Sequence, residues 1–123
     1  MTPQQYFSRL AAEGFVPTLQ GVRATVGFQI QDAGEWRVRV DNGAIEIEEG
    51  PGAADGTLRS DTADFVDVVL GRRHALTALM QGRLSYRGPI VHLIHLSELL
   101  ALGPVLAETP LAGDVGAGGE AHP

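Results

Sequence analysis

The sequence predicts one α+β domain, in which a five-stranded, mainly antiparallel curved sheet carries helices packed on one face. Two neighbouring hairpins of alternating apolar and polar residues lie between positions 23 and 49. Segments with helical spacing stand before and after them, as in domains whose helices cover one face of a sheet. The chain has 123 residues, 44% of them hydrophobic. This length suits one domain that buries about two-thirds of its unfolded surface.

The first predicted element is a short helix over residues 4–13. Thr2 is a candidate N-cap, Pro3 fits the first turn, and Gly14 ends the helix. The apolar side chains of this helix fall on one side: Tyr6, Phe7 and Leu10.

Three strands follow, over residues 23–31, 35–41 and 44–49. Asn42-Gly43 is typical of a two-residue type I′ turn, which needs positive φ at both positions. Such a turn pairs opposite charges on one face and apolar residues on the other: Arg39 with Glu46, Arg37 with Glu48, Val40 with Ile45, and Val38 with Ile47. A three-residue loop over 32–34 closes the first hairpin, pairing Ile30 with Trp36 and Phe28 with Val38.

The second half of the chain alternates short strands and helices. A fourth strand is predicted over 56–60, and Asp61-Thr62-Ala63-Asp64 resembles a capping box that opens a helix ending at Gly71. A second short helix over 74–81 places three apolar side chains on one face: Leu76, Leu79 and Met80. A fifth strand over 83–87 and a last helix over 90–102 complete a domain of residues 1–102. Residues 103–123, rich in Gly, Ala and Pro, are predicted to form a flexible tail.

The composition excludes several classes of function. No cysteine is present, so disulfides, thiolate nucleophiles and cysteine metal sites are ruled out. The formal charge of −6 argues against nucleic-acid binding, which needs clustered basic residues. We see no signal peptide, and no apolar run approaches the ~20 residues that span a bilayer. We therefore expect a soluble, cytoplasmic protein, and its all-arginine set of basic residues is typical of a GC-rich bacterial coding sequence.

The ordered succession of short motifs resembles the sterol carrier protein 2 domain over residues 6 to 102. The matching runs are Trp36-Arg37-Val38, Asp41-Asn42-Gly43, Asp61 through Phe65 to Gly71, and Leu79-Met80-Gln81-Gly82-Arg83-Leu84 with Gly88. The resemblance implies a five-stranded sheet, packed helices and an apolar tunnel between the two layers. Members bind sterols, fatty acids, acyl-CoAs or phospholipids, and some serve as domains of larger enzymes.

We predict that the wall of such a tunnel combines side chains of the sheet and of the helices: Phe28, Trp36, Val38, Phe65, Val69, Leu76, Leu79, Met80, Tyr86 and Ile94. The Tyr86 hydroxyl would give this wall one polar group. The competing interpretation is that these residues only pack on one another as core. With a tunnel, the protein binds or carries a sterol, fatty acyl or isoprenoid ligand, without catalysis and without a cofactor or metal.

The last helix admits more than one role. His92, His95 and Glu98 spread over about 120° of its surface, which indicates a solvated polar face rather than a metal site. The helix is apolar almost all round, so we expect it to be covered on both sides. A tunnel lid, a homodimer contact and a transient membrane contact all satisfy this expectation.

Two other functions compete with ligand carriage. A docking module for an enzyme of lipid or quinone metabolism would use the last helix and the tail. A small cone-fold isomerase or dehydratase is less favoured, because it needs buried Asp or Tyr groups with shifted pKa values. Here Tyr6, Tyr86, Asp41 or Asp55 would have to serve, and the two acids fall at predicted turns. Ser85 also lacks the flanking glycines of a nucleophile elbow.

Overall fold

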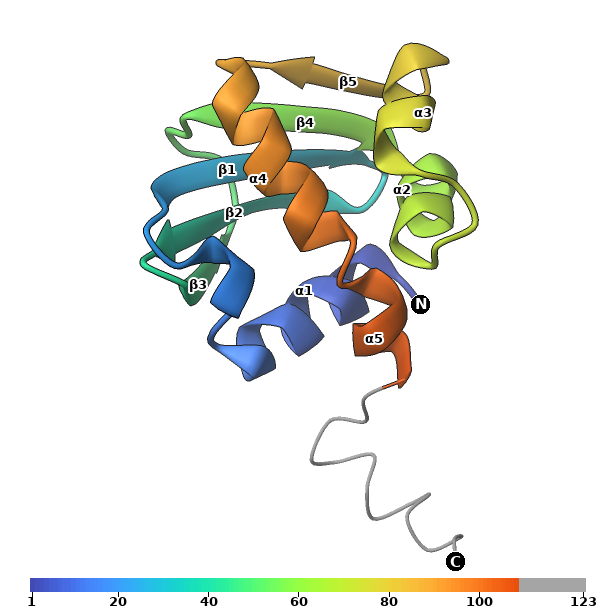
Figure 1. The fold of residues 1–123 in the computed structure, drawn as a ribbon. Coiled ribbons are helices and arrows are strands. Elements are labelled where there is room, and N and C mark those ends of the chain that lie inside the picture. The colour runs from blue at the N-terminus through green and yellow to red at the C-terminus, as the bar shows by residue number, and fades with distance from the viewer. Residues whose placement is uncertain (109–123) are drawn as a thin grey trace, which may run out of the picture.

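The computed structural model describes residues 1–108 as one sheet with helices over one of its faces (Figure 1). The elements follow in the order α1 (Pro3–Glu13), the 3-10 helix η1 (Pro17–Leu19), β1 (Arg23–Gln31), β2 (Gly34–Asp41), β3 (Ala44–Glu49), β4 (Gly56–Asp61), α2 (Thr62–Val69), α3 (Ala75–Met80), β5 (Leu84–Arg87), α4 (Ile90–Leu100) and α5 (Gly103–Glu108). The predicted fold class is confirmed.

The five strands lie in the order β3-β2-β1-β4-β5. Three of the neighbouring pairs are antiparallel, whereas β1 and β4 are parallel, so the sheet is mixed. The parallel pair arises because the chain leaves the edge strand β3 and crosses to the far side of β1.

The link from β3 to β4 makes this crossing over the polar face of the sheet. A Cβ placed on Gly52 would overlap the Arg37 guanidinium, and the Ala54 side chain lies against Gly27 of β1. The Asp55 side chain accepts a hydrogen bond from the Thr25 backbone N–H at 2.7 Å. The small residues of this link let it run close to the strands.

The second hairpin has the predicted register, and the first does not. All four predicted pairs of β2 and β3 are present, and Arg37 Nη2 lies 3.0 Å from Glu48 Oε1. In the first hairpin Phe28 lies opposite Trp36, two residues away from the predicted pairing. The turn begins one residue earlier because Asp32 adopts the left-handed conformation, with φ of 68°. A shift by two residues keeps the apolar side chains on the same face.

The predicted helix starts are confirmed. The Thr2 hydroxyl accepts from the Gln5 N–H at 3.1 Å, and the Gln5 side chain accepts from the Thr2 N–H at 2.9 Å. Asp61 caps α2 through its Oδ1, which accepts from the Asp64 N–H at 2.7 Å. Both caps satisfy backbone donors that the first turn of a helix leaves free.

The end of the domain differs from the prediction. The last helix stops at Leu100, and residues 103–108, which we assigned to the tail, form α5 instead. A Cβ on Gly103 would overlap the Val69 carbonyl group, so this glycine lets α5 approach α2. Leu106 is buried, and Arg9 of α1 donates to the Leu106 carbonyl oxygen at 2.9 Å. The rest of the predicted tail, 109–123, lies outside the described residues.

Residues Ile90–Ala107 are long and apolar enough to cross a membrane by length and composition alone. A turn at 101–102 divides this stretch into α4 and α5. Several of its leucines pack into the core: Leu96, Leu99, Leu100 and Leu106. We therefore describe α4 and α5 as helices of the folded domain.

Candidate functional site

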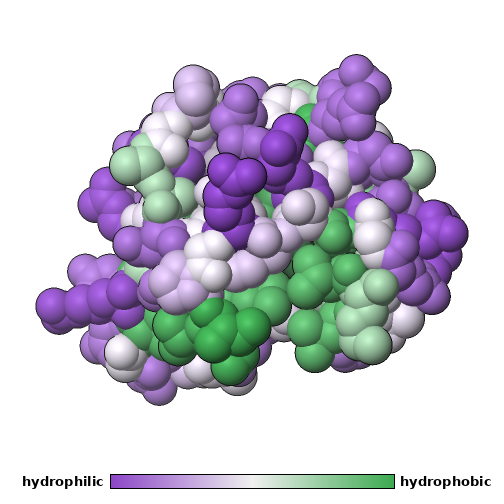
Figure 2. Space-filling model, turned by 90° about the horizontal axis from the view of Figure 1, so that it is seen from above, coloured by the Kyte–Doolittle hydropathy of each residue, from purple (hydrophilic) through white to green (hydrophobic). Residues whose placement is uncertain are grey.

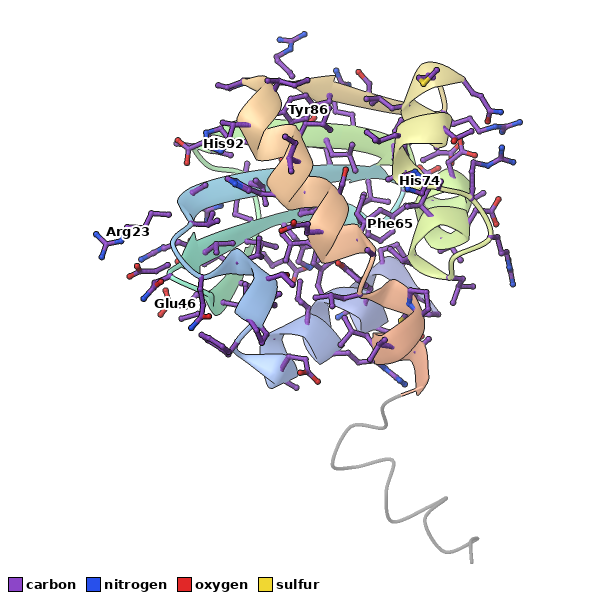
Figure 3. All side chains as sticks on the ribbon, in the orientation of Figure 1. Arg23, Glu46, Phe65, His74, Tyr86 and His92 are labelled. Carbon is purple, nitrogen blue, oxygen red and sulfur yellow. The ribbon has the colours of Figure 1, made fainter. Side chains whose placement is uncertain are left out.

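The ten residues predicted to form the wall divide into two groups in the structure. The first group comes from the sheet and α2 and is buried, with at most 4% of each residue exposed: Phe28, Trp36, Val38, Phe65 and Val69. Figure 3 shows Phe65 in the interior, between α4 and α2. These five residues belong to the hydrophobic core between the sheet and the helices.

Phe7 of α1 packs among the aromatic members of this first group. Its ring centroid lies 4.7 Å from that of Trp36, 5.0 Å from that of Phe28 and 5.7 Å from that of Phe65. Phe7 is itself 2% exposed. In this arrangement the side chains of the first group pack on one another and on Phe7. Sequence analysis placed Phe7 on the inner side of its helix but did not anticipate that it reaches the centre of the predicted wall.

The second group comes from α3, β5 and α4 and lies at the surface. Leu79 and Tyr86 are half-buried and pack against the core. Leu76, Met80 and Ile94 were expected to face inward, but they are 45%, 86% and 56% exposed. The reason in α3 is its short length of six residues. It turns the small Ala78 into the core, so the larger side chains on the other side remain outside.

Two further side chains of α4 extend this surface. Ile90 and Val91 are 70% and 47% exposed. Together with three residues of the second group they form what we call the apolar rim: Leu76, Met80, Ile90, Val91 and Ile94. Helix α3 contacts both β5 and α4, so the rim lies near the β5 edge of the sheet. Figure 2 shows this edge, with apolar surface gathered along one side in two adjoining groups.

The sequence contained a signal for the rim. Helix α4 is apolar almost all round, and a helix that only covers a sheet needs one apolar stripe. The surplus apolar side chains indicated a second contact surface, although periodicity alone could not show which side faces the sheet.

Helix α4 is held differently at its two ends. At its C-terminal end, the Tyr6 hydroxyl donates to the Leu99 carbonyl oxygen at 2.6 Å, within the core. Burial raises the pKa of Tyr6 above its usual range, so this phenol stays a neutral donor. At the N-terminal end, the Tyr86 hydroxyl donates to the Pro89 carbonyl oxygen at 2.5 Å. Figure 3 shows Tyr86 beside the start of α4.

Tyr86 therefore has a different partner from the one predicted. We expected its hydroxyl to be a polar group of the ligand site, whereas here it fastens β5 to the start of α4. Burial raises the pKa of Tyr86, and the negative charge of Asp55 raises it further. The neutral phenol is thus available as a hydrogen-bond donor well above neutral pH.

A pocket of about 230 Å³ lies at the other end of α3, where four helices meet. Its lining comes from α2 and the segment after it, the start of α3, the end of α4 and the start of α5: Val68, Gly71, Arg73, His74, Ala75, Ser97, Leu100, Ala101 and Pro104. Drug-sized ligands occupy sites of roughly 300–1,000 Å³. The volume of this pocket alone is below that range. Figure 3 shows His74, which caps α3, beside it.

A second hollow, an open cleft of about 780 Å³ with several charged residues in its lining, lies at one end of the sheet. It lies between the β1–β2 turn, the start of α2 and the start of β5, and charged residues such as Arg59, Asp61 and Arg83 line it. A hydrocarbon chain gains nothing from such a surface.

Two histidines of α4 lie close to each other. The ring centroids of His92 and His95 are 5.7 Å apart, and both Nδ1 atoms are buried without a hydrogen-bond partner. Within residues 1–108, no group of three or more His, Asp or Glu side chains is placed to hold a metal ion.

Comparison with known proteins gives matches in sequence and in structure. The peroxisomal multifunctional enzyme type 2 of Mus musculus is 36% identical over 61 residues, which make up 48% of this chain and 8% of that enzyme. Palmitated SCP2L2 from Aedes aegypti matches with a TM-score of 0.65 and 20% identity, over 82% of this chain and 96% of that one. The sec-alkylsulfatase Pisa1 from Pseudomonas sp. matches with a TM-score of 0.61 and 19% identity, over 73% of this chain and 15% of that one.

This chain thus corresponds to a small part of both enzymes and to nearly all of the palmitated protein. The model of the SCP-2 sterol transfer family matches residues 7–101, which includes every strand and most of the helices. On this match, the chain belongs to the SCP-2 sterol transfer family.

Proposed function

We propose that this protein binds and carries a hydrophobic ligand with a long hydrocarbon chain, which enters between α3, β5 and the N-terminal half of α4. The observation that carries the proposal is the apolar rim. The rim lies on the same elements as Leu79 and Tyr86, or on their neighbour α4, and these two side chains are half-buried and pack against the core. The palmitate held by the Aedes aegypti protein supports a fatty acyl chain as the ligand class.

The binding energy is sufficient without a charged contact. Burying a chain of sixteen carbons yields roughly 12 kcal/mol, at about 0.8 kcal/mol per methylene. Association and ordering cost about 4–15 kcal/mol. A micromolar complex is therefore within reach when the apolar walls are largely in place.

We expect side chains and the N-terminal half of α4 to move and so make room for the hydrocarbon chain of the ligand. The aromatic cluster around Phe7 packs on β1 and β2, so the middle of the sheet is already covered by side chains. The C-terminal half of α4 is fixed by buried leucines and by Tyr6, whereas the N-terminal half exposes Ile90 and Ile94. We expect α4 to pivot about its C-terminal end, with the bond from Tyr86 to Pro89 broken and re-formed as ligand enters and leaves.

We also propose that the role is non-catalytic. No charged side chain is buried among the described residues, so none sits where a low dielectric would prepare it for acid–base work. The two tyrosines with raised pKa values use their hydroxyl groups to fasten α4.

Native mass spectrometry of the delipidated protein with added palmitic acid tests the proposal. We expect one bound palmitate per chain, and we expect Leu79→Arg to abolish loading because it places a charge at the entrance. The matched control is Ala12→Arg on the exposed side of α1, which should load normally. Fluorescence of Trp36, the single tryptophan, reports whether each variant is folded. Equal loading of Leu79→Arg and the control would contradict the proposed entrance.

The alternative function, docking on an enzyme of lipid or quinone metabolism, would use the same exposed rim. Purification from native cells separates the two possibilities. A stoichiometric enzyme partner bound to unloaded protein would favour docking, whereas co-purified lipid without such a partner would favour carriage.

A further inference from the structure

The face of the sheet that the helices leave uncovered carries its arginines in two arrangements. Over β1, β2 and β3 each arginine lies opposite a carboxylate and pairs with it at 3.0 to 3.5 Å: Arg23 with Asp41, Arg37 with Glu48, and Arg39 with Glu46. Over β4 and β5, Arg59 lies opposite Ser85, and Arg87 lies opposite Thr57. Hydroxyl groups thus occupy the positions where the other half of the sheet has carboxylates.

The groups of the second arrangement have no partners of their own. Within residues 1–108, Arg59 and Arg87 form no ion pair, and the hydroxyl groups of Ser85 and Thr57 form no hydrogen bond to the protein. Arg59, Arg87 and Ser85 are also exposed. Their charges and hydrogen-bond donors are therefore available to a ligand.

Four polar residues form a row across the sheet at this place. Gln29 of β1 is the register partner of Glu35 on one side and of Arg59 on the other, and Arg59 is the partner of Ser85. Register partners on neighbouring strands point to the same face of the sheet. We call these four residues the polar row. Its carboxylate and its guanidinium stand on strands that are two interstrand spacings, roughly 10 Å, apart.

All four residues of the polar row line the open cleft of about 780 Å³ at the end of the sheet. This volume is within the roughly 300–1,000 Å³ of small-molecule sites. Glu35 is half-buried, and like Arg59 it forms no ion pair in the part of the chain that the structure describes. The cleft therefore offers one unpaired positive charge and one unpaired negative charge along the same row.

The other acidic residues of the cleft preserve this polarity. Asp64 pairs with Arg83 at 3.3 Å, and Asp61 accepts a hydrogen bond from the Asp64 N–H at 2.7 Å. Asp32, in the turn between β1 and β2, lies on the same side as Glu35. Free carboxylates thus gather at the β1–β2 side of the cleft, and the free guanidinium lies at the β4–β5 side.

We infer that this cleft binds a small, soluble phosphate ester, of the class of sugar phosphates and nucleotides. The phosphate lies over Arg59 and Ser85, where the forked guanidinium and the hydroxyl donate to its oxygens. Hydroxyl or amino groups of the same ligand donate to Glu35 and Asp32. Gln29, between the two ends of the ligand, can both donate and accept.

The position of the polar row favours a soluble compound over a phospholipid. The apolar rim lies on α3 and α4, whereas the polar row lies on the uncovered face of the sheet. Figure 2 shows mainly hydrophilic surface on the side of the β5 edge opposite the apolar groups. A phospholipid whose headgroup lay on the polar row would leave its acyl chains in water. The site is separate from the proposed entrance, so the inference does not depend on the proposed carriage.

Isothermal titration calorimetry with AMP, inorganic phosphate and adenosine tests the inference. We expect AMP to bind more tightly than inorganic phosphate, because it also reaches the carboxylates. Adenosine lacks the phosphate and should bind about ten-fold or more weakly than AMP, since a hydrogen bond to a charged group contributes at least that factor. Added salt should weaken AMP binding, because Arg59 is exposed. Amide shifts in NMR spectra of the AMP complex should fall within 29–35, 59–61 and 83–85.

Three variants separate the two ends of the row. Arg59→Gln should weaken the binding of AMP and of inorganic phosphate about ten-fold or more. The matched control is Arg39→Gln, which removes an arginine of the same face that is already paired with Glu46, and it should bind AMP as the unchanged protein does. Glu35→Gln should weaken the binding of AMP and not that of inorganic phosphate. Trp36 fluorescence reports whether each variant is folded.

Four results would overturn the inference. They are no binding of AMP, equal binding of AMP and adenosine, equal loss in Arg59→Gln and Arg39→Gln, or amide shifts that fall outside the cleft. Palmitate loading of Arg59→Gln is measured in parallel and should equal that of the unchanged protein. Lost loading in this folded variant would contradict the separation of the two sites.

Discussion

Replacing Phe7 by alanine is the most direct test of how the core and the ligand site are related. Phe7 is buried, and its ring meets four other aromatic rings, with centroids between 4.7 and 5.7 Å away. Truncating a buried phenylalanine costs about 3–5 kcal/mol. The four ring contacts, each worth about 0.5–1.5 kcal/mol beyond burial, place the expected loss near 5 kcal/mol. Denaturant unfolding followed by Trp36 fluorescence measures this loss.

The same substitution should help a hydrocarbon chain to bind. It removes the ring that packs among Phe28, Trp36 and Phe65, and a hydrocarbon chain can take its place. A ligand present at about one hundred times its Kd stabilises the folded protein by about 2.7 kcal/mol. We expect Phe7→Ala to bind palmitate more tightly than the unchanged protein does. At the same palmitate concentration, the denaturant midpoint of Phe7→Ala should then rise by more than the midpoint of the unchanged protein.

Leu19→Ala is the matched control for this experiment. Leu19 is fully buried in η1, on an element that carries none of the rings of the aromatic cluster, so its loss also leaves a cavity and costs about 2–5 kcal/mol. Palmitate should restore Phe7→Ala and not Leu19→Ala. Equal restoration of the two variants, or none in Phe7→Ala, would refute the view that the ligand site lies against the aromatic cluster.

Three further predictions concern the elements around the site. Because the pKa values of Tyr6 and Tyr86 are raised, ultraviolet difference spectra should show less phenolate in the folded protein than in the unfolded protein at pH 10, where unfolded tyrosine is half ionised. The stability that these tyrosines contribute is complete below pH 10 and falls as the pH rises further; equal phenolate in the folded and unfolded protein at pH 10 would contradict this. Asp61→Ala removes the N-cap of α2 and should lower the free energy of unfolding, measured with denaturant, by about 1 kcal/mol. An unchanged free energy of unfolding would show that this cap does not stabilise the fold. Gly103→Ala should detach α5 and expose its backbone amides to hydrogen exchange, because its Cβ would overlap the Val69 carbonyl; unchanged protection would disprove that contact.

Local chemistry was enough to predict much of this fold. The Asn42-Gly43 turn fixes the register of β2 and β3, because both residues accept positive φ, and here they have φ of 52° and 89°. Thr2 and Asp61 mark helix starts through hydrogen bonds that span three residues. Such signals depend on neighbours in the sequence, so they can be recognised without knowing the rest of the molecule.

The features that the sequence did not predict depend on distant contacts. Asp32 and Gly34 could each close the first hairpin, and the choice between them shifts the register by two residues. Helix α5 consists of residues with a tail-like composition, and it is held by contacts of Leu106 and Gly103 with other helices. The parallel pairing of β4 follows from a crossing link whose path no local pattern specifies.

The candidate site shows the same division. The core residues Phe28, Trp36 and Phe65 were recognisable as inward-facing from strand alternation and helical spacing. Periodicity did not decide between the two sides of α3, because Ala78 and Leu76 are both apolar. The smaller one is buried since it allows α3 a closer approach to β5 and the core. For so short a helix, shape decides which side faces inward, and hydrophobicity does not.

The uneven attachment of α4 bears on how a ligand could enter. Its C-terminal half packs into the core through Leu96, Leu99 and Leu100, while its N-terminal end is held by the hydrogen bond from Tyr86 to the Pro89 carbonyl oxygen. Ile90 and Ile94 of the N-terminal half are already exposed, so moving this half away from β5 would break few core contacts. That movement would uncover Leu79 at the proposed entrance. A hydrocarbon ligand entering there gains about 0.8 kcal/mol for each methylene that leaves water, which offsets the loss of the Tyr86 hydrogen bond.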